Sequence, residues 1–209
     1  MIYPIRLYGD PMLRKKASPV TSFDAALKQL AADMLETMYH YNGIGLAGPQ
    51  IGVPKRLFIA VEVDKSQERE EDEDAPPPLT MDEKRERWGV IAEHFMVNPE
   101  ILSRSGEQPG VDGCLSLPGL FTEDVQREDE ITVRYQDAAG EWHERNAKGH
   151  FAWVIQHEYD HLEGVFFFDR LPAPAKRAFI DEHRSELAAM QREAKAFLKE
   201  HRGSEVTVQ

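Results

Sequence analysis

The sequence predicts an α+β fold in which antiparallel or mixed sheets pack around a central helix, with an N-terminal helix and a long C-terminal helix. Three observations support this fold class. Apolar residues recur at steps of three and four near both ends of the chain, in residues 23–41 and 173–202. Runs rich in β-branched residues lie between these segments. The helical period returns at residues 150–161, which contain the sequence HEYDH. This order of elements is typical of α+β proteins.

Composition limits the class of protein. The 209 residues suit one domain, and 41% hydrophobic and 30% charged residues are ordinary for a globular chain. No apolar run approaches the length of a membrane span, and the N-terminus lacks the pattern of a signal peptide, so we expect a cytoplasmic location and no membrane partner. The net charge of −12 argues against nucleic-acid binding through bulk charge, and no direct sequence-specific binding is expected.

The first helix is predicted from a clear apolar stripe. Thr21 or Ser22 is expected to cap its start, and Gly43 is expected to end it. A glycine-rich segment at 43–50 follows, and residues 56–63 are expected to form a strand. The stripe consists of Phe23, Leu27, Leu30, Met34, Leu35, Met38 and Tyr41.

Residues 64–88 differ from their surroundings in composition. They contain an acidic block followed by three prolines, in the sequence EREEDEDAPPP. Both features oppose packing in a core. We therefore expect an exposed insertion between two strands.

The middle of the chain predicts further strands and the last helix. Residues 94–102 are expected to form a second strand that ends at Asn98-Pro99. Residues 131–136 and 141–145 are expected to pair as a hairpin through the turn 137–140. Pro172 is expected to open one long helix over residues 173–202, and the chain shows no internal repeat.

The sequence HEYDH at residues 157–161 is the strongest chemical signal. On a helix His157 and His161 lie one turn apart on one face, so both imidazoles can hold one metal ion. Glu158 lies beside them, within reach of a metal-activated water. Trp153 and Val154 make the same face apolar, and two buried histidines need partners, which a metal supplies.

A third ligand must come from another segment. Phe167 stands where the HExxHxxGxxH pattern needs a third histidine, which excludes that protease class. Glu182 would serve in an HExxH metallo-endopeptidase, although it belongs to a charged helix. Cys114 is the one cysteine, so it forms no intrachain disulfide. Composition alone favours a buried thiol, but a thiolate is also a strong ligand for zinc or ferrous iron. A non-catalytic interaction module stabilised by metal is a further alternative.

The glycine-rich segment GIGLAGPQ, residues 43–50, allows its backbone to approach a ligand closely. Gln50 at its end carries an amide donor that could stabilise an oxyanion. On its own this segment is more often an ordinary turn before a strand.

In combination three segments resemble the bacterial peptide deformylase family. That family carries GxGLAAxQ, EGCLS and HExxH in this order. Here they stand as GIGLAGPQ (43–50), DGCLS (112–116) and QHEYDH (156–161). The resemblance covers almost the whole chain and implies one deformylase-like domain over residues 1–209.

The resemblance implies a role for each matching residue. Glu158 would be the general acid and base, and Gln50 with the backbone N–H of Leu115 would hold the formyl oxygen. Gly45 would pair with the substrate backbone, and Arg127 would pair with the acid of the EGCLS segment. That acid is Asp112 here, one methylene shorter than the usual Glu, which puts the pairing in doubt. The implied metal ligands are Cys114, His157 and His161.

The implied activity is removal of the formyl group from formyl-methionyl nascent polypeptides, with release of formate. The implied cofactor is one divalent metal per chain, Fe²⁺ in cells, with Zn²⁺, Ni²⁺ or Co²⁺ as substitutes. The C-terminal helix resembles one that docks some members on the ribosome, but its basic residues are mixed with acids, so only weak contact is expected. Gly48 and the insertion at 64–88 depart from the family pattern.

A pocket for the methionine side chain is expected beside the metal. His150, Trp153 and Val154 precede His157 by seven, four and three residues and share its face of the helix. Ile44 on the glycine-rich segment would form the opposite wall. The alternative for Trp153 and Val154 is that they belong to the core.

Overall fold

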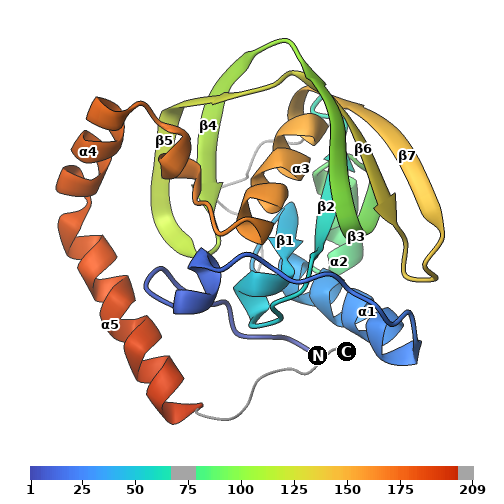
Figure 1. Cartoon of the computed structure of the whole chain (residues 1–209), viewed down its shortest axis with the longest axis horizontal. Coiled ribbons are helices and arrows are strands. Elements are labelled where there is room, and N and C mark those ends of the chain that lie inside the picture. Colours follow the sequence, from blue (N-terminus) through green and yellow to red (C-terminus); the bar gives the residue numbers. More distant parts are fainter. Residues whose placement is uncertain (67–78, 202–209) are drawn as a thin grey trace.

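The computed structural model describes residues 1–66 and 79–201, and its elements form two antiparallel sheets with helices around them (Figure 1). The larger sheet has five strands in the order β1-β2-β3-β6-β7, and β4 and β5 pair as a separate hairpin. The α+β fold with antiparallel sheets is therefore confirmed. The strands are β1 Gly45–Ala47, β2 Leu57–Val63, β3 Val90–Ser105, β4 Gln108–Cys114, β5 Leu117–Arg127, β6 Glu130–Gln136 and β7 Trp142–Lys148.

Helix α3 lies between the large sheet and the β4–β5 hairpin (Figure 1). It packs against β1 and β2 on one side, and Trp153 meets Gly110 of β4 on the other. None of the helices in the described residues combines the length and the apolar composition that a membrane span requires. The helices are α1 Ala25–His40, α2 Met81–Arg87, α3 Gly149–Leu162, α4 Ala173–Glu182 and α5 Arg184–Glu200, with 3₁₀ turns η1 Pro11–Arg14, η2 Gly48–Ile51 and η3 Phe167–Arg170.

Helix α1 forms where its apolar stripe predicts, but both predicted ends are wrong. Asp24 caps the start, because its carboxylate accepts hydrogen bonds from the N–H groups of Ala26 (2.9 Å) and Leu27 (3.0 Å). Asn42, with φ of 58°, takes the left-handed position after the helix instead of Gly43. Asparagine tolerates this conformation better than most residues.

Strand β3 does not end at Asn98-Pro99, so that prediction is wrong. It continues to Ser105 through an irregularity between Val97 and Glu100. Pro99 lacks an N–H for the ladder, and the irregularity accommodates this loss. The side chain of Asn98 is bonded to the N–H and C=O of Val20, both at 2.9 Å, and so fixes the N-terminal segment on the sheet.

The segment between β2 and β3 is not entirely an exposed insertion. Its last part forms α2, which begins with a capping box between Thr80 and Glu83. Trp88 stacks on Tyr39 of α1 with ring centroids 5.5 Å apart, so this part packs on the body of the protein. The acidic block and the prolines at 68–78 lie outside the described residues.

The expected long helix over 173–202 is broken into α4 and α5 at His183. The break allows Phe179 of α4 and Leu187 of α5 to enter one apolar cluster with Phe167 and Phe168. The hairpin at 131–145 forms as predicted, as β6 and β7, with Gln136 opposite Trp142.

Candidate metal centre

Helix α3 presents the HEYDH residues in the interior. Residues 151–155 are apolar, and Gln156, His157 and Asp160 in the second half of the helix have polar partners, so most of its side chains can be buried between the sheet and the hairpin. His157 and His161 lie one turn apart, with ring centroids 5.0 Å apart. They are 8% and 1% exposed, so they do not belong to an ordinary solvated helix face.

Cys114 comes from the end of β4 to meet these histidines. Its Sγ lies 3.2 Å from Nε2 of His161, and one ligand atom from each of Cys114, His157 and His161 lies within 4.8 Å of the others. Nδ1 of His157 contacts Asp112, which leaves Nε2 available to a metal ion. A thiolate and two imidazoles at this spacing suit zinc or ferrous iron, so the residues fit the metal that the family resemblance implies.

Glu158 lies beside this group and packs closely against the backbone of Gly45, where any larger residue would clash with it. A Cβ on Gly45 would lie 2.3 Å from Oε1 of Glu158, so the bare backbone of β1 can approach the carboxylate. Glu158 is 4% exposed, and Oε2 has no hydrogen-bond partner in the part of the chain that the structure describes. Burial raises the pKa of Glu158 to about 7. This pKa suits a group that takes up and releases a proton near neutral pH.

Hydrogen bonds hold the side chain of Gln50 so that its amide nitrogen points toward Cys114. Its Oε1 accepts a 2.7 Å hydrogen bond from the N–H of Ala47. Its Nε2 donates toward Oγ of Ser116 at 3.4 Å and Sγ of Cys114 at 3.5 Å. Leu115, which lies between Cys114 and Ser116 in the sequence, lines the same pocket as Gln50. The two residues that carry the predicted donors of an oxyanion site therefore lie together beside Cys114.

Asp112 reaches Arg127 despite its shorter side chain. The guanidinium donates from Nε and Nη2 to Oδ2 of Asp112, at 3.1 and 2.7 Å. Oδ1 of Asp112 lies 2.7 Å from Nδ1 of His157, so the carboxylate orients this ring. Burial alone would raise the pKa of Asp112, but His157 and Arg127 outweigh it and lower the pKa to about 2.

Sequence reasoning missed two residues behind this pair. Asp160, inside HEYDH, accepts from Nη1 of Arg127 at 3.0 Å and from Nε of Arg170 at 3.1 Å. Nothing in the sequence shows that its side chain turns away from the ligand group. Arg170 follows the motif by nine residues, and a charged residue there is ordinary on a surface.

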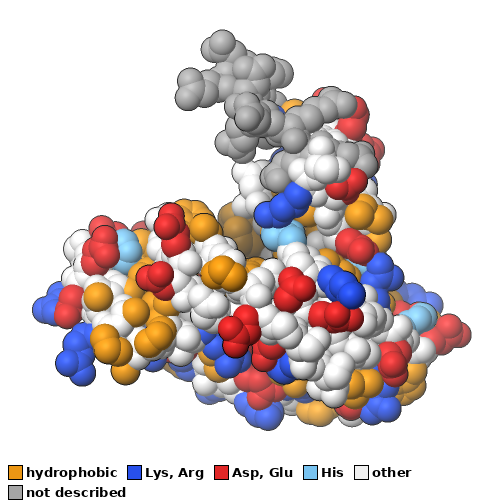
Figure 2. All heavy atoms as spheres, turned by 90° about the horizontal axis from the view of Figure 1, so that it is seen from above, with side chains coloured by type: hydrophobic (Ala, Val, Ile, Leu, Met, Phe, Trp, Pro, Cys, Tyr) orange, Lys and Arg blue, Asp and Glu red, His pale blue; other side chains and the backbone are white. Residues whose placement is uncertain are grey.

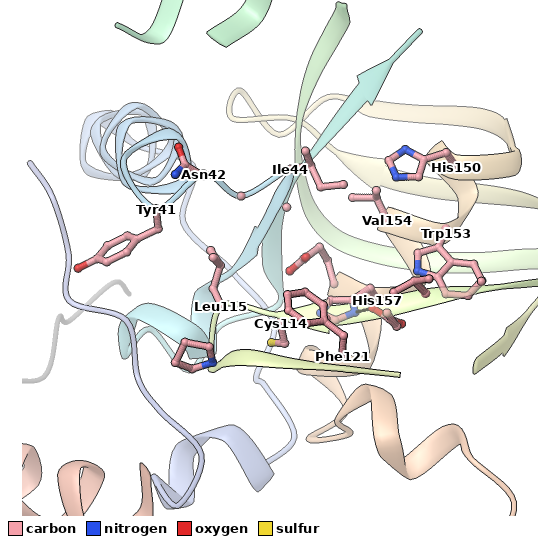
Figure 3. A pocket seen from close by; sticks show the side chains of 18 of the residues that line it. Tyr41, Asn42, Ile44, Cys114, Leu115, Phe121, His150, Trp153, Val154 and His157 are labelled. Carbon is pink, nitrogen blue, oxygen red and sulfur yellow. Dashed lines mark hydrogen bonds and ion pairs between the residues drawn. The ribbon is translucent and has the colours of Figure 1, made fainter. Parts of the chain in front are cut away.

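The structure brings the predicted pocket residues to one cavity of about 810 Å³. In Figure 3, Ile44, Val154 and His150 lie together at one side, and Cys114 and His157 lie nearer the hairpin. Burial, and then the charge of Lys65, lowers the pKa of His150 to about 4. All five predicted residues line the cavity: Ile44, Gly45, His150, Trp153 and Val154.

Glu182 does not join the ligand group. Within the described residues, the groups of three or more His, Cys, Asp or Glu side chains that could hold a metal are the one at Cys114 and an exposed one in the β6–β7 hairpin. The exposed group consists of Asp137, Glu141 and His143. The endopeptidase alternative therefore has no support.

Fold and ligand group together define a metal-dependent hydrolase. A family model described as polypeptide deformylase matches residues 2–177. The chain belongs to the peptide deformylase family, whose members remove the formyl group from N-formyl-methionyl peptides.

Similar proteins agree over most of the chain. A peptide deformylase of Thermus thermophilus is 50% identical over 200 residues, which cover 96% of this chain and 98% of the relative. One from Thermotoga neapolitana is 41% identical over 188 residues, covering 90% and 97%. A crystal structure of the peptide deformylase from Thermus thermophilus superposes with a TM-score of 0.78 at 45% identity, covering 92% of this chain and 99% of that one. The non-catalytic alternative therefore has no support either.

Proposed function

We propose that Cys114, His157 and His161 hold one divalent metal and that Glu158 acts as general acid and base in removal of the formyl group. The observation that carries this proposal is the approach of the three ligand atoms to within 4.8 Å of one another, with Glu158 next to His157. When bound, the metal supplies a Lewis acid that activates water and polarises the formyl oxygen. Residues of the chain transfer the proton, stabilise the developing negative charge and bind the substrate.

Glu158 moves the proton. It takes a proton from the attacking water and gives it to the departing amine, so one carboxylate serves both steps. The position of Oε1 against Gly45 and the unpartnered Oε2 support this role, since the carboxylate faces the space where the reacting atoms would lie. The pKa of about 7 lowers the cost of changing its protonation state.

Gln50 and the N–H of Leu115 stabilise negative charge on the formyl oxygen. The bond from Ala47 to Oε1 of Gln50 fixes the amide, so its nitrogen points to the site before substrate arrives. Donors that are already oriented need no rearrangement as charge develops.

The methionine side chain of the substrate lies among Ile44, His150, Trp153 and Val154. Trp153 and Val154 are buried in the core and also line the cavity, so they would contribute both to the core and to the methionine pocket. The peptide backbone pairs with β1 at Gly45, which lets the enzyme accept varied residues beyond methionine.

The native ion is proposed to be Fe²⁺, with Zn²⁺, Ni²⁺ or Co²⁺ as substitutes, since all suit one thiolate and two imidazoles. We place the chain in the cytoplasm, as one domain over residues 1–209, with formyl-Met nascent peptides as partners. Weak ribosome contact through α4 and α5 completes the proposal. Basic and acidic residues are mixed along both helices, as they are on the face of the molecule in Figure 2, so a contact would depend on local groups of basic residues.

The direct test of Glu158 is its replacement. Glu158→Ala should retain metal, because all three ligands remain, and should lose about 10²–10⁴-fold in kcat. Metal content and formate release from a formyl-Met peptide are measured on the same sample. Near wild-type turnover with metal retained would exclude the assigned role.

A further inference from the structure

A chain of charged contacts runs from His157 to the protein surface. Asp112 contacts His157 and Arg127, Arg127 contacts Asp160, and Asp160 contacts Arg170. The side chains of Asp112, Arg127 and Asp160 are 4%, 3% and 6% exposed, whereas that of Arg170 is 45% exposed. Of these residues, only His157 has a part in the proposed mechanism, as a metal ligand.

Arg127 lies between two carboxylates that compete for it. It gives Nε and Nη2 to Asp112 and only Nη1 to Asp160. Arg170 supplies the remaining bonds of Asp160, with Nε on Oδ2 at 3.1 Å and Nη2 on Oδ1. A buried carboxylate without these bonds would draw the nearest guanidinium toward itself.

We infer that Asp160 and Arg170 are positioning residues of the metal centre. Arg170 satisfies Asp160, so that Arg127 stays bonded to Asp112 through Nε and Nη2. Asp112 in turn fixes the ring of His157. This inference rests on the proposed function, since it takes His157 as a metal ligand. Neither residue is catalytic, because both lie behind the ligands.

Arg127 also connects this chain to the pocket. Its guanidinium carbon lies 5.3 Å from the centroid of the Trp153 ring, which lines the cavity. The backbone of Gly110 also packs closely on Trp153, because a Cβ on Gly110 would lie 2.9 Å from its ring. A shift of Arg127 toward Asp160 would therefore disturb both the metal ligand and the wall of the pocket.

Arg170→Ala tests the inference, and Lys176→Ala is its matched control. Lys176 lies nearby, is 37% exposed at its side chain and pairs with Asp169 at 2.6 Å, a carboxylate outside the chain of contacts that leads to His157. Each variant removes a partly exposed base that pairs with a carboxylate of low exposure, so the melting temperature of each is measured alongside metal release. Cobalt-loaded enzyme is mixed with a chelator, and metal release is followed by the visible absorption of the cobalt–thiolate centre.

Arg170→Ala should release cobalt about tenfold faster than the wild type, the lower end of the usual effect of a partner behind a metal ligand. Lys176→Ala should stay within about twofold, since its ion pair does not lead to a ligand. Arg170→Lys should lie between Arg170→Ala and the wild type, because an ammonium keeps the charge but lacks the planar pair of donors that matches both oxygens of a carboxylate. Equal release from Arg170→Ala and Lys176→Ala would overturn the inference.

If Asp112 and Asp160 compete for Arg127, removing the charge of Asp160 should reverse the effect of Arg170→Ala. Adding Asp160→Asn to Arg170→Ala removes the charge that draws Arg127 away, so metal release should slow again. Unchanged or faster release would overturn the inference. A wild-type chain that holds no metal would instead overturn the proposed function, whereas equal rates with metal held would leave that function intact.

Discussion

His150 leads to a prediction about acid stability. Burial, and then Lys65, lowers its pKa in the folded chain to about 4 from 6.5. As pH falls through 6.5 the unfolded chain takes up a proton that the folded chain does not, so the unfolding free energy decreases. Between pH 7.5 and 5.5 this loss is about 1 kcal/mol. Denaturant titrations at equal metal content should show that His150→Leu lacks it.

The control for this measurement is His40→Leu, which removes an exposed histidine at the end of α1. The decrease in stability with falling pH should be smaller in His150→Leu than in both the wild type and His40→Leu. The same decrease in all three proteins would contradict the burial of a neutral His150.

The sequence predicts some residues of the site and not others. His157 and His161 could be predicted because helical spacing alone places them on one face. The same spacing places Asp160 on the helix, but its contact with Arg127 depends on the position of the end of β5, which local pattern does not give. Arg127 pairs with Asp112 as the family resemblance implies, and the shorter Asp112 does not prevent this pairing.

At the scale of elements, local pattern predicted some elements well and others poorly. Helix α1 and the β6–β7 hairpin carry their own periodicity or turn residues, and both form where expected. The β4–β5 hairpin was not predicted, because it depends on close contacts such as Phe121 over Gly113, where a Cβ would lie 2.3 Å from the ring. The break at His183 likewise depends on the apolar cluster that α4 and α5 share.

The irregularity in β3 gives a stability prediction. Asn98 has φ of 49° and bonds both backbone groups of Val20, so Asn98→Ala should lose these bonds and strain the backbone. A loss of about 2 kcal/mol in unfolding free energy is expected. Asn98→Gly loses the bonds without the strain and should be less destabilised. Urea unfolding of the variants measures the difference.

Asn146→Ala is the control, because Asn146 is exposed on β7. It should change the unfolding free energy by no more than about 0.5 kcal/mol. If Asn98→Ala and Asn146→Ala were equally stable, the side chain of Asn98 would not hold the N-terminal segment to the sheet.

At the scale of the whole molecule, the site is assembled from segments far apart in the sequence. Gln50 follows β1, Cys114 ends β4, and His157 and His161 lie on α3. Periodicity could not predict that Gln50 and Cys114 meet the histidines of α3. The order of the three motifs indicated this only through the family resemblance. The fold brings Cys114, His157 and His161 together because α3 passes between the sheet that carries β1 and the hairpin that carries β4 (Figure 1).

The central claim is that one metal, held by Cys114, His157 and His161, supports deformylation. Its most direct test is formate release from a formyl-Met peptide by anaerobically prepared metal-free enzyme, titrated with Fe²⁺. Activity should rise in proportion to added metal and reach its plateau at one ion per chain. Full activity without metal, or a plateau only at two ions per chain, would contradict the account.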